Sequence, residues 1–296
     1  MICVTGAGGT VGSELVRQLG AARVPFRAAF NSPDKAQAAR ARGVDAAVVD
    51  YHEPDTLRAA LRGCDALFLL APSVPDQTEL ELHAVETASA AGLRRIVKQS
   101  VYDAAEEGFA IARIHRPVEK AIEASGLAFT FLRPNAFMQN VVTYMGPTIR
   151  AESAFYSAAG DGRIAHVDVR DIAAVAVAAL TRPGHDGKAY SLTGSEALTY
   201  DEVAAELSRA LGRTIRHVNL PPEDYRAGML AEGLPEQLAD AMTDLERLYR
   251  EGQASEVSGD VKLVTGQEPR RFAAYARECA PQLQPDAHGA TKAEVR

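Results

Sequence analysis

Four glycines near the start of the chain form the segment of this sequence best suited to chemistry. Gly6, Gly9 and Gly12 are spaced three residues apart, Gly8 lies between them, an apolar run precedes them and a helical pattern follows. A loop without side chains lets the backbone approach a diphosphate, and the first N–H groups of the next helix then face its negative charge. This order predicts a dinucleotide-binding loop, in preference to a tight turn with spare glycines.

His115 and Glu119 are a second candidate group, four residues apart in a segment predicted to be helical. Residues at this spacing share one helix face, where a carboxylate could hold the tautomer of an imidazole that relays a proton near neutral pH. Ser100 and Tyr102 follow the preceding strand and are the other catalytic candidates. A structural or solvated histidine is the alternative interpretation, and Pro117 could kink the helix between the pair.

Six strands that alternate with helices are expected to position these residues. The predicted strands are Ile2–Thr5, Pro25–Phe30, Ala46–Val49, Ala66–Leu70, Arg95–Gln99 and Ala128–Leu132, and the helices are 13–20, 33–42, 54–61, 77–91 and about 111–125. Continuous apolar strands are typical of a parallel sheet that is covered on both faces. The pattern predicts an α/β fold with a doubly wound Rossmann sheet, whose ligand crevice lies at the carboxyl ends of the strands.

A smaller, mostly helical lobe is predicted after about residue 150. We expect a dinucleotide-binding domain of residues 1–152, to which 164–196 return, a substrate lobe of 153–163 and 197–283, and a disordered tail of 284–296. Within the lobe, 154–156 and 163–167 are predicted as a hairpin or a strand–loop–strand, and Thr199 with Glu202 as a capping box.

The end of the second predicted strand bears on the choice of dinucleotide. Sites for NAD usually have Asp or Glu there, to bind the ribose 2′-hydroxyl. Asn31 stands in this place, and Ser32 and Lys35 could contact a 2′-phosphate, although Asn31 and Ser32 also fit a helix cap. The sequence therefore modestly favours NADP(H) over NAD(H).

The other candidate contacts follow the remaining strands. For the cofactor they are Thr5, Thr10 and Val11 of the glycine segment, and Asp50, Tyr51, Ala71, Pro72, Ser73, Gln99, Ser100, Pro134, Asn135 and Phe137. For the substrate they are Phe137, Met138, Asn140 and Tyr144. Asp50 fits a solvated turn equally well, Phe137 and Met138 fit core packing, and Lys98 could be a surface residue and receives no role.

Composition excludes several classes of protein. The 296 residues carry a net charge of −7 without a basic stripe, which argues against direct binding of nucleic acid. There is no apolar run of the roughly 20 residues that a membrane helix needs, and no signal peptide. The three cysteines lie far apart, which predicts neither a disulfide framework nor a zinc site and favours the cytoplasm. No HExxH motif or other ligand cluster predicts a metal.

Longer segments carry a family resemblance. Together with the glycine motif, residues His115–Asn140, Asp168–Ala173 and Gly187–Arg213 resemble the NmrA-like branch of the atypical short-chain dehydrogenase/reductases, over residues 1 to about 280. That family includes triphenylmethane-dye reductases, azo- and quinone-reductase-like enzymes, and redox-sensing regulators that bind the dinucleotide without known turnover. The resemblance implies the fold and a nicotinamide cofactor strongly, and the reaction less strongly.

The expected reaction follows from what the candidate site lacks. Standard short-chain dehydrogenases use a Tyr-x-x-x-Lys pair, and the segment after the fifth strand has none. We therefore expect hydride transfer to an electron-poor, conjugated small molecule of the quinone, azo or triarylmethane type. The alternative is a redox sensor that acts through a protein partner without turnover, and a weaker third possibility is an isomerase or biosynthetic reductase similar to the plant phenylpropanoid reductases. The oligomeric state is not predicted.

Overall fold

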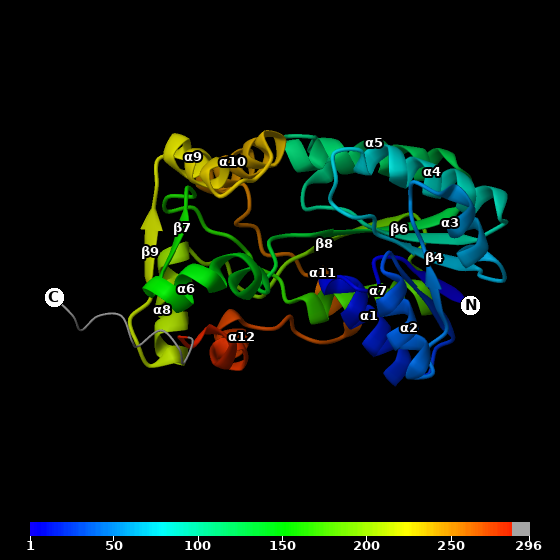
Figure 1. The fold of residues 1–296 in the computed structure, drawn as a ribbon, viewed down its shortest axis with the longest axis horizontal. Helices are drawn as coiled ribbons and strands as arrows, with labels where there is room; N and C mark the ends of the chain where they lie inside the picture. The colour runs from blue at the N-terminus through cyan, green and yellow to red at the C-terminus, as the bar shows by residue number, and fades with distance from the viewer. Residues whose placement is uncertain (286–296) are drawn as a thin grey trace. The chain divides into compact units, whose positions relative to one another are not determined.

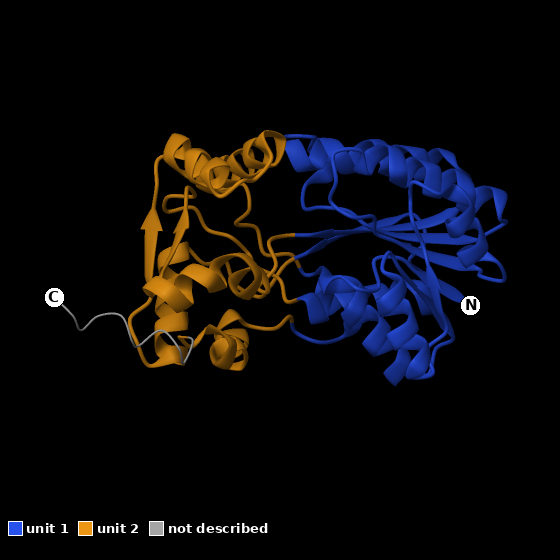
Figure 2. Ribbon diagram, in the orientation of Figure 1, with its two compact units in different colours: residues 1–134, 169–192, 259–268 blue, residues 135–168, 193–258, 269–296 orange. Residues whose placement is uncertain are grey.

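The computed structural model describes residues 1–285, which form two compact units. Unit 1 comprises Met1–Pro134, Val169–Leu192 and Gly259–Glu268, and unit 2 comprises Asn135–Asp168, Thr193–Ser258 and the chain from Pro269 onward (Figure 2). These bounds differ from the expected domains in four segments, since 135–152, 164–168 and 193–196 belong to unit 2 and 259–268 return to unit 1. Residues 286–296 of the predicted tail lie outside the described residues.

Unit 1 is built on a parallel seven-stranded sheet in the order β3-β2-β1-β4-β5-β6-β8. The strands are β1 Ile2–Val4, β2 Phe26–Phe30, β3 Ala46–Val48, β4 Ala66–Leu69, β5 Arg95–Gln99, β6 Ala128–Pro134 and β8 Lys188–Leu192. The four residues of β4 are all buried, as expected for a strand covered on both faces. The predicted doubly wound Rossmann fold is confirmed.

Helices cover both faces of this sheet (Figure 1). One face carries α3 Pro54–Leu61, α4 Gln77–Ala90 and α5 Ala110–Ala124, and the other carries α1 Thr10–Ala21, α2 Pro33–Ala41, α7 Val169–Thr181 and α11 Asp260–Thr265. Under α3, α4 and α5, the core includes Leu67, Ile96, Val118 and Phe131. The helix α5 is continuous through Pro117. A short 3-10 turn, η1 Ala104–Glu106, precedes it.

Unit 2 combines short helices with a parallel pair of strands, β7 Ala154–Ser157 and β9 Arg216–Asn219. Its helical elements are the π-helix η2 Val141–Met145, α6 Gly146–Glu152, α8 Tyr200–Leu211, α9 Pro222–Ala231, α10 Glu236–Arg250, α12 Phe272–Cys279 and the 3-10 turn η3 Ala280–Leu283. None of the helices within residues 1–285 is long and apolar enough to span a membrane.

Two local predictions for unit 2 have different outcomes. The capping box is confirmed, because Glu202 N–H donates to Thr199 Oγ1 at 3.1 Å and Thr199 N–H donates to Glu202 Oε2 at 2.9 Å. The predicted strand at 154–156 is present as β7, but 163–167 forms no strand, so the hairpin alternative is wrong. The loop after β7 packs against α10, where Ala158 N–H donates to Glu246, and Ile164 forms only an isolated bridge to Leu198. The edge of β7 is then free to pair with β9.

Candidate functional site

The glycine segment forms the turn from β1 to α1. Gly6 has a φ of +63°, which a residue with a side chain adopts only under strain. A Cβ on Gly12 would lie 2.1 Å from the carbonyl oxygen of Gly6, so the first turn of α1 rests directly on the loop. Gly9 is the N-cap and has no side chain to occupy the first N–H groups of α1. The loop is thus a cradle of backbone groups at a helix start, which suits a diphosphate.

Lys35 reaches this cradle from α2. A Cβ on Gly8 would lie 3.3 Å from Lys35 Cδ and 3.6 Å from its Nζ, so the ammonium group lies beside the loop. Ser32 is the N-cap of α2 and accepts from Lys35 N–H at 3.3 Å, which is the capping role considered as the alternative. Asn31 is exposed. The structure therefore brings the positive charge of Lys35 beside the glycine loop.

Three predicted cofactor residues already have hydrogen-bond partners within the fold. Thr5 Oγ1 donates to the Phe68 carbonyl at 2.9 Å and accepts from Leu70 N–H at 3.0 Å, which ties β1 to β4. Tyr51 donates its hydroxyl to the Leu70 carbonyl at 3.3 Å, and burial raises the pKa of this phenol. Asp50 accepts from His52 N–H at 2.9 Å, which favours its interpretation as a turn residue.

The carboxyl end of β5 holds two buried polar atoms that lack a well-formed hydrogen bond. Within the described residues, Gln99 Oε1 makes no hydrogen bond, and Ser100 Oγ faces the Glu119 carboxylate without a well-formed one. A buried polar atom left unsatisfied costs about 1–3 kcal/mol. Tyr102 follows, half-buried, and its N–H donates to the Pro134 carbonyl at 2.9 Å. Ligand groups at this edge of the sheet would therefore find unsatisfied partners.

Lys98 is fully buried, with no exposed surface, so its interpretation as a surface residue is wrong. Its Nζ lies 2.7 Å from Oε2 of Glu81 on α4, which is also fully buried. The same ammonium group donates to the Gln99 carbonyl at 2.8 Å and lies 3.2 Å from Nδ1 of His115. Burial, together with the charge of Lys98, holds the pKa of His115 well below its ordinary value. His115 is therefore a neutral imidazole at pH 7.

Glu119 shares the buried face of α5 with His115 but has other partners. Arg133 of β6 donates to both of its oxygens, from Nε at 3.0 Å and from Nη2 at 2.7 Å, and Arg116 donates at 3.0 Å. Burial by itself raises the pKa of Glu119, but the hydrogen bonds from Arg133 and its other neighbours outweigh this effect and lower it. Lys98, and not Glu119, holds the imidazole of His115, which corrects the predicted pairing.

The loop after β4 joins the same cluster. Ala71 is buried and its N–H donates to Glu81 Oε1 at 3.2 Å, whereas Pro72 and Ser73 are exposed. Sequence reasoning missed Lys98 and Glu81, although their positions carried a signal. A lysine in the middle of a buried parallel strand, and a glutamate on the apolar face of a helix, can only be accommodated when they are paired.

The predicted substrate residues lie in unit 2 and differ in exposure. Tyr144 is 75% exposed on the π-helix η2, and Phe137 and Asn140 are half-buried. Met138 is a core residue, which was the alternative interpretation. Asn135, at the start of unit 2, is buried with its amide donating to the Ala254 carbonyl at 2.9 Å and its oxygen accepting from Ala136 N–H at 2.8 Å. Pro134 ends β6 in unit 1.

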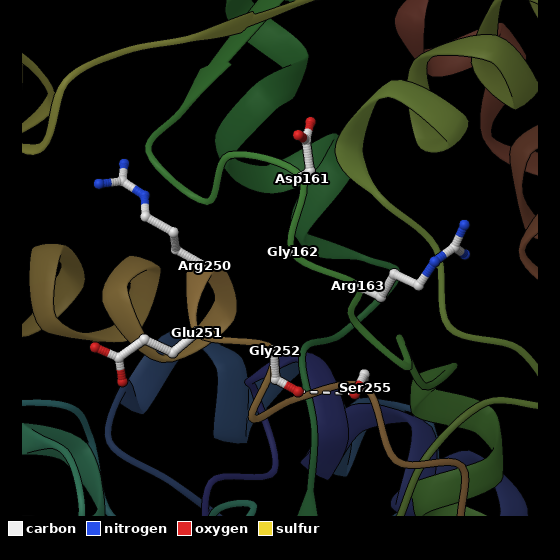
Figure 3. A pocket seen from close by; sticks show the side chains of 7 residues that line it. All are labelled: Asp161, Gly162, Arg163, Arg250, Glu251, Gly252 and Ser255. Atoms are coloured by element: carbon white, nitrogen blue, oxygen red, sulfur yellow. Dashed lines mark hydrogen bonds between the residues drawn. The ribbon is translucent and has the colours of Figure 1, made fainter.

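Unit 2 also has a surface pocket, lined by Asp161, Gly162, Arg163, Arg250, Glu251, Gly252 and Ser255 (Figure 3). The guanidinium groups of Arg163 and Arg250 point away from each other in Figure 3, and Arg163 is paired with Glu202. The two arginines therefore do not converge on an anion.

Unit 2 contains a Ser–His–Asp chain of hydrogen bonds like that of a serine hydrolase, formed by Ser157, His217 and Asp201. Unlike the nucleophile of a hydrolase, its serine is buried. His217 Nε2 lies 2.8 Å from Ser157 Oγ and its Nδ1 lies 2.9 Å from Asp201 Oδ1. Ser157 is only 1% exposed, and the N–H of the next residue, Ala158, already donates to Glu246. Without an accessible nucleophile or a free oxyanion-hole donor, this chain ties β7 to β9 and α8.

Comparison with known proteins relates the whole chain to one group. The model of the NmrA-like family matches residues 1–276. The chain is 42% identical to the NAD(P)H azoreductase of Xenophilus azovorans over 278 residues, which are 94% of this chain and 97% of that protein. An NADPH complex of the NADPH-dependent quinone oxidoreductase from Escherichia coli is similar in structure, with a TM-score of 0.86, 31% identity and coverage of 94% and 99%. The triphenylmethane reductase of Citrobacter sp. with NADP(H) has a TM-score of 0.82, 27% identity and coverage of 94% and 99%.

Proposed function

The chain belongs to the NmrA-like family, and from this premise we propose that it is an NADPH-dependent reductase of electron-poor, conjugated small molecules. Quinones, azo compounds and triarylmethane dyes are the proposed substrate classes, in line with the names of the relatives. The observation that carries the proposal is the carboxyl end of β5, where Gln99 Oε1 is buried without a hydrogen-bond partner and the buried Ser100 Oγ has only a poorly formed contact with the Glu119 carboxylate. A dinucleotide that enters over the glycine loop would end where such atoms need partners.

Different residues of unit 1 are proposed to bind different parts of the dinucleotide. We propose that the backbone of Gly6–Gly12 holds the diphosphate, that Lys35 contacts the 2′-phosphate, and that Gln99 and Ser100 contact the nicotinamide end. When bound, the reduced nicotinamide supplies a hydride. Thr10, Val11, Pro72 and Ser73 remain proposed contacts from their places along the same edge.

The electrostatics of the site explain why conjugated acceptors fit. A neutral imidazole is a hydrogen-bond donor and a weak acid, so His115 cannot protonate a substrate as an imidazolium would. Electron-poor conjugated acceptors delocalise the electron pair that arrives with the hydride and need only modest stabilisation of the new negative charge. The side chains of Phe137, Asn140 and Tyr144 in unit 2 are the proposed contacts to such a flat molecule. Three buried cysteines in the thiol form agree with a reducing, cytoplasmic setting.

The test of this function is a turnover assay with several acceptors. We expect the protein to oxidise NADPH, followed at 340 nm, in the presence of a quinone, an azo dye or a triarylmethane dye, and to use NADH less efficiently. Wild-type protein without an acceptor is the control for slow oxidation by oxygen. Calorimetry that finds tight NADPH binding, with no acceptor reduced, would favour the sensor that acts through a protein partner.

Lys35 gives a prediction about the choice of dinucleotide. We expect Lys35→Ala to weaken NADPH binding about tenfold, which is about 1.4 kcal/mol, because an ion pair with the 2′-phosphate is lost. NADH binding should change by less than about twofold, since NADH has no phosphate at that position. The matched control is Lys120→Ala, which removes an exposed lysine of α5 that is paired with Glu107. An equal loss for both nucleotides would instead place Lys35 on the diphosphate.

A further inference from the structure

Lys98 places a buried ammonium group between a carboxylate and an imidazole. Its Nζ forms an ion pair with Glu81 Oε2 at 2.7 Å, donates to the Gln99 carbonyl at 2.8 Å and lies within hydrogen-bond distance of His115 Nδ1, at 3.2 Å. Lysine donates and never accepts. Nδ1 must therefore be the acceptor in this contact, so it carries no proton, and the single proton of the neutral ring lies on Nε2.

The other side of the imidazole is open to a ligand. Within residues 1–285 no hydrogen bond is recorded for His115 Nε2, and the side chain is not completely buried. An N–H held in a fixed direction is suited to an oxygen or nitrogen atom that gains electron density during the reaction. Glu81 extends the cluster, because its other oxygen accepts from Ala71 N–H in the loop after β4.

We propose that Lys98 and Glu81 are positioning residues that hold His115 with its proton on Nε2, so that this N–H donates a hydrogen bond to the substrate atom that becomes electron-rich. The inference rests on the proposed function and adds a requirement to the substrate. The substrate must present a carbonyl oxygen or an azo or imine nitrogen conjugated to the carbon or nitrogen that receives the hydride. The hydride adds to that second carbon or nitrogen, and the electron pair that it displaces collects on the oxygen or nitrogen that accepts the hydrogen bond from His115. Solvent supplies the final proton, while His115 keeps its own.

The variants that test this role separate charge balance from catalysis. Lys98→Met alone leaves the Glu81 carboxylate buried without its cationic partner and is expected to destabilise the fold. The double variant Lys98→Met/Glu81→Gln removes both charges, so it should regain most of that stability in urea unfolding. The matched control is Lys120→Met/Glu107→Gln. It removes the exposed ion pair between Lys120 of α5 and Glu107, and it should leave turnover unchanged.

Turnover of the double variant is the first readout. We expect kcat with a quinone to fall by on the order of ten- to a hundredfold, while the affinity for NADPH stays within about twofold of wild type. In a His115→Ala background the same two replacements should cause no further loss, because Lys98 acts through the imidazole. A stable double variant with wild-type kcat would overturn the proposal, as would a large additional loss in the His115→Ala background.

The nitrogen spectrum of His115 is the second readout and needs no substrate. In wild-type protein at pH 7 we expect a protonated Nε2 and an unprotonated Nδ1, and in the double variant a mixture of tautomers. A proton on Nδ1 of the wild-type ring would overturn the assignment. If the wild-type protein reduces no acceptor, the proposed function and the catalytic use of this N–H fail together, whereas the tautomer still stands or falls on the spectrum.

Discussion

Gly12→Ala is expected to reduce NADPH affinity by at least about a hundredfold, which corresponds to about 2.8 kcal/mol. The new Cβ would lie 2.1 Å from the Gly6 oxygen, 2.6 Å from the Gly6 carbonyl carbon and 3.0 Å from Ala7 Cα. These are backbone atoms, which cannot rotate away as the end of a flexible side chain does. The first turn of α1 must therefore move off the loop, and the N–H groups proposed to face the diphosphate move with it. Calorimetry with NADPH measures the loss.

Gly20→Ala provides a matched control in the same helix. Its Cβ would find nothing nearer than Phe26 Cε1 at 4.0 Å, and the position is exposed. Alanine inside a helix is favoured over glycine by about 0.5–1 kcal/mol, so this variant should unfold at an equal or higher urea concentration and bind NADPH normally. Gly12→Ala, in contrast, should lose about 1–3 kcal/mol through overpacking. Unchanged NADPH affinity in Gly12→Ala would refute the assignment of the loop.

The sheet could be predicted from sequence because its signals are local. Apolar runs of four to six residues mark the buried strands, and the glycine turn and helix caps mark the connections, so the parallel pairing of the strands follows from the rules of βαβ units. The end of β6 was less predictable. The strand continues to Pro134, because Arg133 and Pro134 pair with Ser191 and Leu192 of β8, and that partner lies more than fifty residues away in the chain. The pairing of β7 with β9 was missed for the same reason.

The candidate site also has one part that local sequence predicts and one part that it does not. The glycine loop was predictable because its residues are adjacent in sequence and their function depends on the backbone. The partners of His115 were not, since Lys98 and Glu81 come from β5 and α4 and meet it only in the folded unit. The spacing of His115 and Glu119 placed both correctly on one face of α5, but spacing along a helix does not tell which strand residues face them. The polarity of β5 and α4 at these two positions was the remaining signal.

Glu119→Ala is expected to destabilise the fold by about 3–5 kcal/mol, the range for removing one partner of a buried ion pair. It leaves Arg133 without the carboxylate that accepts two of its hydrogen bonds, and deprives Arg116 of one of its two acidic partners. Glu123→Ala is the matched control, because this carboxylate contacts Arg116 from a side chain that is 38% exposed. An exposed pair contributes at most about 1 kcal/mol. Urea unfolding of both variants at pH 7 gives the comparison.

The pH dependence of the difference in unfolding free energy between wild type and Glu119→Ala tests whether the charge of Glu119 causes that difference. Because the folded-state pKa of Glu119 is lowered from 4.5, its contribution is fully present above that value and is lost as the pH falls through the folded pKa. The gap in unfolding free energy between wild type and Glu119→Ala should therefore be constant between pH 6 and 8, at ordinary ionic strength, and narrow below about 4.5. A gap that stays the same at low pH would mean that the lost packing volume, and not the charge, sets the cost. In that case the buried carboxylate would be a spacer between α5 and β6, and Glu119→Gln would retain nearly all of the wild-type stability.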